Sequence, residues 1–142
     1  MSRSFLRGVA AAIVALVALA LLPAATASAH AALQSSTPAA NSVLEQSPPD
    51  LVLDFDEDIE ASLASIELFD GDGESVEVGA PQPGDDASVV TASLPELDDG
   101  LYAVIWRVTS ADGHAVNGAF SFQIGTGATG DGQDLIDQVA NG

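Results

Sequence analysis

Apolar and polar residues alternate in several short stretches of the chain, and each stretch is followed by residues typical of turns. In the segment 51–55, Leu51, Leu53 and Phe55 fall on one face of an extended backbone, because successive side chains of a strand point to opposite faces. Similar short β-prone segments recur at 64–68, 76–78, 89–92, 101–109 and 119–124. Short strands separated by turns are typical of an all-β fold, and we expect one small antiparallel β-sandwich or β-barrel domain.

The first 29 residues have the three parts of a secretory signal peptide. Arg3 and Arg7 supply a basic start, residues 8–22 form an unbroken apolar run, and Pro23 ends this run before an A-x-A site that closes at Ala29. Signal peptidase cleaves after such small residues. We therefore expect cleavage after Ala29 and an exported protein that resides in the periplasm, outside the cell or at the cell envelope.

Two other fates of this leader stay open. Counted through Pro23 to Ala25, the apolar stretch is near the lower length limit for a membrane-spanning helix, although the proline and the small residues after it favour cleavage over an uncleaved anchor. A second A-x-A site ends at Ala27, and cleavage there would leave Ser28-Ala29-His30 as the amino terminus. No second apolar segment follows, so we expect no stable membrane anchor after cleavage.

Residues 30–125 form the predicted β domain, and residues 126–142 form an acidic tail rich in glycine, threonine and aspartate. We expect this tail to be flexible. Leu135, Ile136 and Val139 have the spacing of at most one marginal helical turn.

Charge and composition narrow the range of partners. The chain has 21 acidic residues against three basic ones, and Arg107 is the only basic residue after the leader. Such a protein repels nucleic acid and anionic lipid and attracts cations, although most of its carboxylates simply keep an exported protein soluble. It has no cysteine and its only methionine is Met1. Disulfides and sulfur ligands for a metal are therefore excluded after cleavage, and we expect a monomer.

Cleavage after Ala29 would make His30 the amino terminus, where its α-amine and ring nitrogen together chelate a metal ion. The only other histidine is His114, and Asp112 lies two residues before it. Residues at i and i+2 of an extended backbone lie on the same side. Nitrogen and oxygen ligands suit Cu(II) in a tetragonal arrangement, and Zn(II) accepts the same set as a tetrahedron.

Each of these residues also has a simpler interpretation. Asp112-Gly113 is a strong turn dipeptide, and a lone surface histidine usually has no special role. Glu57 belongs to an acidic run that fits a solvated surface. Cleavage after Ala27 would create an amino terminus with His30 at its third position, which chelates Cu(II) by itself through two backbone amides.

Three blocks of sequence are more specific than any single residue. The blocks are HAALQSSTPA at 30–39, LDFDE at 53–57, and a late block made of GLY at 100–102, WRVTSADGH at 106–114 and GAFSF at 118–122. Over about residues 30–125 the chain resembles the CopC/PcoC family of periplasmic copper-resistance proteins. The late block is the most specific, because it places the rare residues Trp106 and His114 at set offsets.

This resemblance implies an immunoglobulin-like Greek-key sandwich or barrel and a Cu(II) carrier or buffer in copper homeostasis and resistance, not an enzyme. It implies that His30, Asp112 and His114 hold one Cu(II), with Glu57 as a weak further contributor, and that the partner is an inner-membrane copper transport protein of the CopD type. The chain departs from the family pattern at Ala115, where members often have proline. It also lacks the methionine-rich Cu(I) site of some members.

Two alternatives belong to other functional classes. An amino-terminal histidine with a second histidine is similar to the copper brace of lytic polysaccharide monooxygenases, but only 5% of this chain is aromatic and an Asp ligand takes the place of an open oxygen site. The other alternative is an extracellular sandwich domain with incidental histidines. In every case we expect Tyr102 and Trp106 in the core, and Arg107 on the opposite face beside carboxylates.

Overall fold

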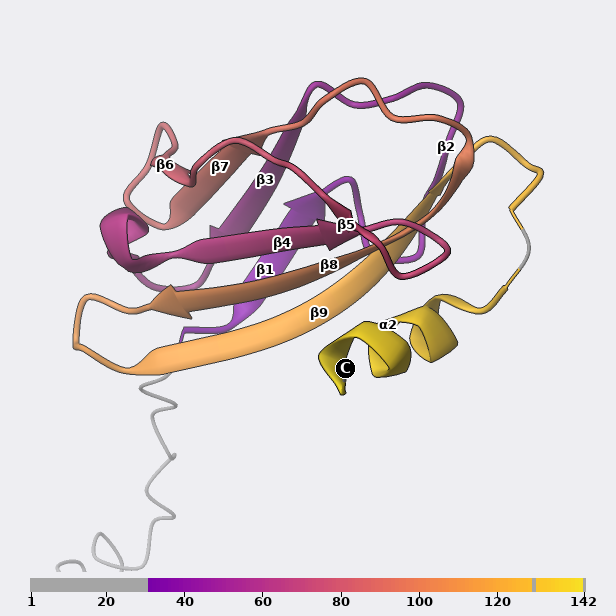
Figure 1. Ribbon diagram of the computed structural model, residues 1–142. Helices are drawn as coiled ribbons and strands as arrows, with labels where there is room; N and C mark the ends of the chain where they lie inside the picture. Colours follow the sequence, from indigo (N-terminus) through magenta and orange to yellow (C-terminus); the bar gives the residue numbers. More distant parts are fainter. Residues whose placement is uncertain (1–30, 129, 142) are drawn as a thin grey trace, which may run out of the picture.

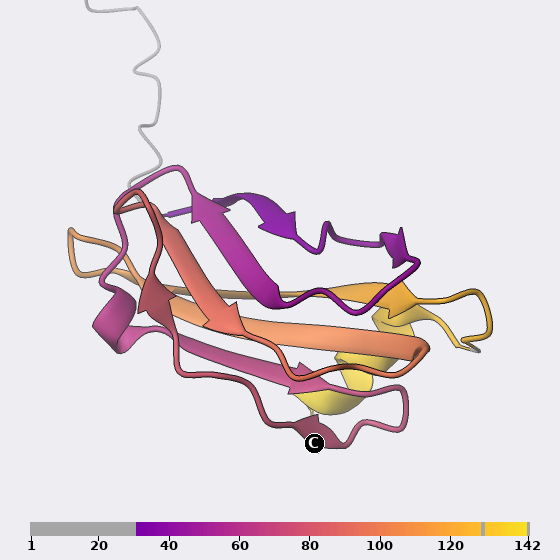
Figure 2. The same cartoon turned by 90° about the horizontal axis from the view of Figure 1, so that it is seen from above.

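Within residues 31–128 and 130–141, which this computed structural model describes, two β-sheets pack face to face (Figures 1 and 2). His30 and both predicted cleavage sites lie outside the described residues. One sheet has the strand order β1-β3-β7-β6, with bounds Leu33–Thr37, Asp50–Phe55, Val89–Ser93 and Gln82–Pro83. The other sheet has the order β2-β9-β8-β4-β5, with bounds Val43–Leu44, Ala115–Ile124, Gly100–Thr109, Ser65–Phe69 and Ser75–Val76.

The pairing of the strands distinguishes a sandwich from a barrel. Neighbouring strands are antiparallel except at β2, which runs parallel to β9. Each named strand pairs only within its own sheet, so the two layers are not closed into a barrel. The predicted all-β fold is confirmed in its sandwich form.

Apolar side chains at alternating strand positions fill the space between the sheets. The three residues predicted for the inner face of the segment 51–55 are all buried. Tyr102 and Trp106 are buried too, as predicted, and the Trp106 ring meets that of Phe55 edge to face with centroids 5.2 Å apart. Gly118 is opposite Trp106 in the β8–β9 register, and a Cβ there would lie 2.4 Å from the indole ring. The bulk of the indole therefore explains the glycine.

The observed strands differ from the predicted ones mainly at the sheet edges. Neither β1 nor β2 is indicated by alternation, and the short strand β6 lies between the predicted segments 76–78 and 89–92. β9 begins at Ala115 rather than at 119. An edge strand is held largely by backbone hydrogen bonds to one neighbour, so its side chains need not alternate between a buried and a solvated face.

A C-terminal helix, α2 (Gly132–Ala140), lies against β8 and β9 on the side away from the other sheet (Figures 1 and 2). Asp131 caps it by accepting a hydrogen bond from the Gln133 amide at 2.7 Å, and Leu135 is buried. The tail thus contains a longer helix than the single turn expected, because packing against a sheet stabilises a helix that is marginal alone. None of the helices within the described ranges is long and apolar enough to cross a membrane.

Candidate metal centre

The turn that joins β8 to β9 carries two of the predicted ligands, Asp112 and His114. The Ser110 amide donates to the His114 carbonyl at 2.9 Å, and the Gly113 amide donates to the Ser110 carbonyl at 2.8 Å. Gly113 has a φ of 91°, which glycine adopts without the steric penalty of a side chain. The Asp112-Gly113 dipeptide therefore forms the predicted turn, and this turn folds the two ligand residues toward each other.

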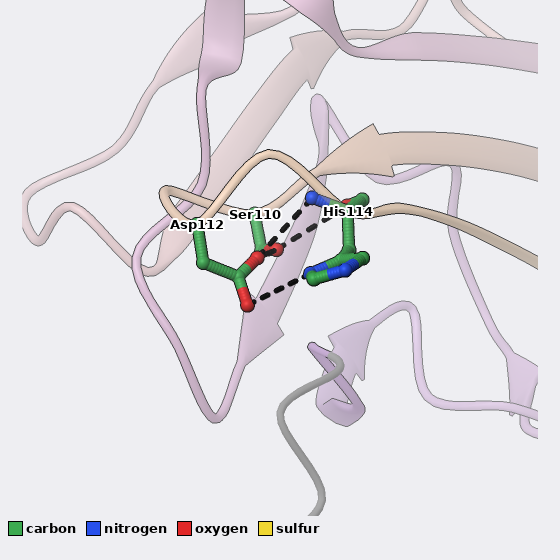
Figure 3. A network of polar contacts seen from close by, with 3 residues as sticks. All are labelled: Ser110, Asp112 and His114. Carbon is green, nitrogen blue, oxygen red and sulfur yellow. Dashed lines mark hydrogen bonds and ion pairs between the residues drawn. The ribbon is translucent and has the colours of Figure 1, made fainter.

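The carboxylate of Asp112 contacts the imidazole of His114 directly (Figure 3). Asp112 Oδ2 lies 2.9 Å from His114 Nδ1, and Asp112 Oδ1 accepts a hydrogen bond from the His114 amide at 3.2 Å. The buried Ser110 hydroxyl donates to the same Oδ1 and lies 3.2 Å from the His114 carbonyl. Because the Asp112 and His114 side chains are 39% and 56% exposed, a dissolved ion can reach both.

These contacts stabilise the charged form of Asp112. The hydrogen bond from the Ser110 hydroxyl is the main cause, followed by those from the ring and the amide of His114, and the pKa of the carboxyl falls from 3.8 to about 2. Asp112 is thus an anion at any pH well above that value, which is the form that binds a cation.

Removal of the Ser110 hydroxyl is expected to raise the pKa of Asp112. Ser110→Ala loses the largest of the stabilising contacts, so the carboxyl should titrate between about 2 and its ordinary value of 3.8. An NMR titration of the Asp112 carboxyl carbon measures this shift. Because the pKa is depressed in the folded state, its stabilising effect is present above the unfolded value of 3.8 and is lost as the pH falls toward about 2.

Ser36→Ala is the matched control for this titration, because the Ser36 hydroxyl bonds to the Pro38 carbonyl instead. It should leave the Asp112 pKa unchanged. Equal Asp112 pKa values in Ser110→Ala and in the unsubstituted protein would contradict the role assigned to the hydroxyl.

The segment that follows β3, residues 56–60, joins this turn to the start of the described chain. At one end, the Asp58 carbonyl accepts a hydrogen bond from the Ala111 amide at 2.9 Å. At the other end, Asp56 Oδ1 accepts from the Ala32 amide at 2.6 Å, and the Asp56 amide donates to the Ala32 carbonyl at 3.0 Å. The β8–β9 turn and the first described residues accordingly lie at the same end of the sandwich in Figures 1 and 2.

The structure places three of the four predicted ligands. It brings Asp112 and His114 into contact, and it places Glu57 in the 56–60 segment between the two bonded ends. His30 lies outside the described residues. Among the residues that are described, no three His, Cys, Asp or Glu side chains are close enough together to hold a metal ion, so Glu57 does not form a three-membered cluster with the pair.

Two polar residues that shape this end of the molecule were not predicted. Serine is common in turns, and this was the signal that the sequence offered for Ser110. Its burial depends on the packing of the strands. Asp56 looks like any other member of an acidic run until Ala32 is seen to lie beside it. For Arg107, the expected carboxylate partner is not found, since Asp112–His114 is the only ion pair in the described ranges.

Comparison with known proteins identifies the domain. Residues 33–125 match the family model of the CopC domain. Copper transport protein CutJ of Bacillus subtilis is 32% identical over 80% of this chain, but this chain spans only 21% of CutJ. Copper resistance protein C of Pseudomonas syringae pv. tomato is 30% identical, covering 78% of this chain and 93% of that protein.

Solved structures agree with this match. The crystal structure of CopC from Methylosinus trichosporium OB3b has a TM-score of 0.63 at 31% identity and covers 72% of this chain and 98% of its own. That of PcoC from Escherichia coli, described as a methionine-rich copper resistance protein, has a TM-score of 0.62 at 28% identity, covering 68% of this chain and all of its own. The match over most of the domain and the shared sandwich lead to one conclusion: this chain belongs to the CopC family.

Proposed function

We propose that this chain is an exported Cu(II) carrier or buffer that holds one ion through His30, Asp112 and His114, with Glu57 as a weak further contributor. The observation that carries the proposal is the exposed Asp112–His114 pair on a hydrogen-bonded turn. Relatives named for copper resistance and copper transport support the choice of copper. Cu(II) is favoured over Cu(I) because the chain has no cysteine and no methionine beyond Met1.

The spacing of the pair suits two neighbouring positions of a square-planar site. Asp112 Oδ2 and His114 Nδ1 lie 2.9 Å apart. Two ligand atoms that each bind an ion at about 2.0 Å, at right angles to one another, lie about 2.8 Å apart. The distance between the two atoms can therefore stay almost unchanged on binding, but the imidazole ring must turn so that Nδ1 points at the ion, which takes the place of the proton, rather than at Oδ2. Because binding displaces protons, affinity falls as the pH is lowered.

His30 completes the ligand set if signal peptidase cuts after Ala29. The new α-amine and the imidazole then supply two nitrogens. Ala31, the next residue, is only 5% exposed and belongs to the hydrophobic core. The peptide bond to residue 30 therefore leaves from an anchored point at the end of the sandwich that carries the turn, which supports the participation of the amino terminus.

A membrane copper transport protein of the CopD type is the partner we infer. The domain matched in CutJ is about a fifth of a much longer polypeptide that is named a copper transport protein. A separate chain of this family, acting as a monomer in the periplasm or at the cell envelope, would bring Cu(II) to such a protein. The oxidative-enzyme alternative has no comparable support, because relatives here are named for copper resistance and transport.

Copper titration of the secreted, purified protein tests this function. Intact mass first establishes whether the protein begins at His30. We then expect one Cu(II) per chain and a rise in Tm with Cu(II), because an ion bound only by the folded state stabilises that state. A Tm that does not respond to Cu(II) would favour a sandwich domain without a metal.

A further inference from the structure

We propose that Asp56 is a positioning residue for metal binding. It holds the start of the mature chain in place through its two hydrogen bonds to Ala32, which we call the Asp56 clamp. This inference rests on the proposed function. Asp56 holds Ala32 at two points: its Oδ1 accepts from the Ala32 amide at 2.6 Å, and its amide donates to the Ala32 carbonyl at 3.0 Å. Both polar backbone groups of Ala32 are thus bonded to one residue, two positions after His30.

Asp56 is itself held in place by the core and by the hydrogen bonds at the end of β3. Asp56 directly follows Phe55, which is 3% exposed and pairs with Leu33 of β1. The Phe55 amide donates to the Ser88 carbonyl at 3.0 Å, which fixes the end of β3. Because consecutive Cα atoms are about 3.8 Å apart, the chain before Ala32 starts from a point that these hydrogen bonds fix.

The same segment also fixes the turn that carries the other ligands. Beyond Asp56, the Asp58 carbonyl accepts from the Ala111 amide, and the Glu60 amide donates to the Thr109 carbonyl, both at 2.9 Å. Residues 56–60 therefore tie the amino-terminal segment and the β8–β9 turn to one short stretch of backbone. Ligand groups held in this way need little ordering when an ion arrives, and a smaller loss of conformational entropy strengthens binding.

Asp56→Ala is expected to weaken Cu(II) binding about tenfold, in the range found when a partner that orients a metal ligand is removed. Asp56→Asn keeps a side-chain oxygen that accepts from the Ala32 amide, so it should retain affinity within about twofold. Asp58→Ala removes an equal charge two positions along but keeps the backbone carbonyl that contacts the turn, and it too should stay within about twofold. Competition titration with a Cu(II) chelator measures all three variants.

A double-mutant cycle shows whether Asp56 acts through the amino terminus. In a His30→Ala background, Asp56→Ala should cause a smaller further loss, because the α-amine is then the only amino-terminal nitrogen left to position. The Cu(II) electron paramagnetic resonance spectrum should change in Asp56→Ala and be restored in Asp56→Asn. In the copper-free protein, the Ala32 amide should lose protection from hydrogen exchange in Asp56→Ala only.

Several results would overturn the inference. Equal weakening of binding by Asp56→Ala and Asp58→Ala would mean that charge alone matters. An undiminished effect of Asp56→Ala in the His30→Ala background would mean that Asp56 does not act through the amino terminus. Either result leaves the proposed function intact if the unsubstituted protein binds one Cu(II). Failure of the unsubstituted protein, with His30 as its amino terminus, to bind Cu(II) would overturn both.

Discussion

His114→Ala is expected to weaken Cu(II) binding by at least about 100-fold, because loss of a ligand should exceed the effect of losing a partner that only orients one. The substitution removes the imidazole nitrogen that lies 2.9 Å from Asp112 and leaves the carboxylate without that neighbour. His30→Ala should have an effect of similar size, since it removes one of the two nitrogens at the amino terminus. Isothermal titration with a competing chelator measures both affinities.

Asp112→Asn and Gln133→Ala complete this experiment. Asp112→Asn keeps the size of the side chain but removes its charge, so it should weaken binding; Gln133 lies in α2, outside the ligand-bearing segments, and its substitution should have no effect. Unchanged affinity in both histidine variants would refute the site. Loss of binding in His30→Ala alone would instead indicate cleavage after Ala27, because Ser28-Ala29-His30 chelates Cu(II) without the turn.

Phe55→Ala is expected to lower the free energy of unfolding by about 4 kcal/mol, as for other buried aromatic residues. Phe55 is 3% exposed and its ring packs edge to face against Trp106, so truncation leaves a cavity beside a large rigid ring. This is a large part of the stability of a small domain, which is typically about 5–15 kcal/mol. Urea unfolding followed by the fluorescence of Trp106, the single tryptophan, gives the value.

Leu63→Ala is the matched control for stability. Leu63 lies in the 3-10 helix η1 (Ala61–Leu63) and is 62% exposed, so its truncation should change the free energy of unfolding by less than about 0.5 kcal/mol. Similar losses in the two variants would show that the Phe55–Trp106 contact is not a central part of the core.

The central strands are predictable from local sequence, whereas the edges are not. In the segment 51–55 and in the late strands β8 and β9, apolar side chains at alternating positions face the other sheet, so the alternation reveals these strands. β1 has no such pattern, because it lies at a sheet edge and is defined by its pairing with β3. Helix α2 gives a weak signal for a similar reason: it gains its stability from contact with β8 and β9.

The candidate site divides in the same way. The sequence by itself determined which ligand types the chain can offer, and it indicated that Asp112 and His114 lie on the same side. Local backbone geometry is enough for this, because the turn at Gly113 brings residues two positions apart together. Only the tertiary structure decided that Ala32 and this turn lie at one end of the sandwich. That proximity depends on hydrogen bonds to the segment 56–60 between residues far apart in the chain, and such bonds form only when packing of the core has folded the strands over one another.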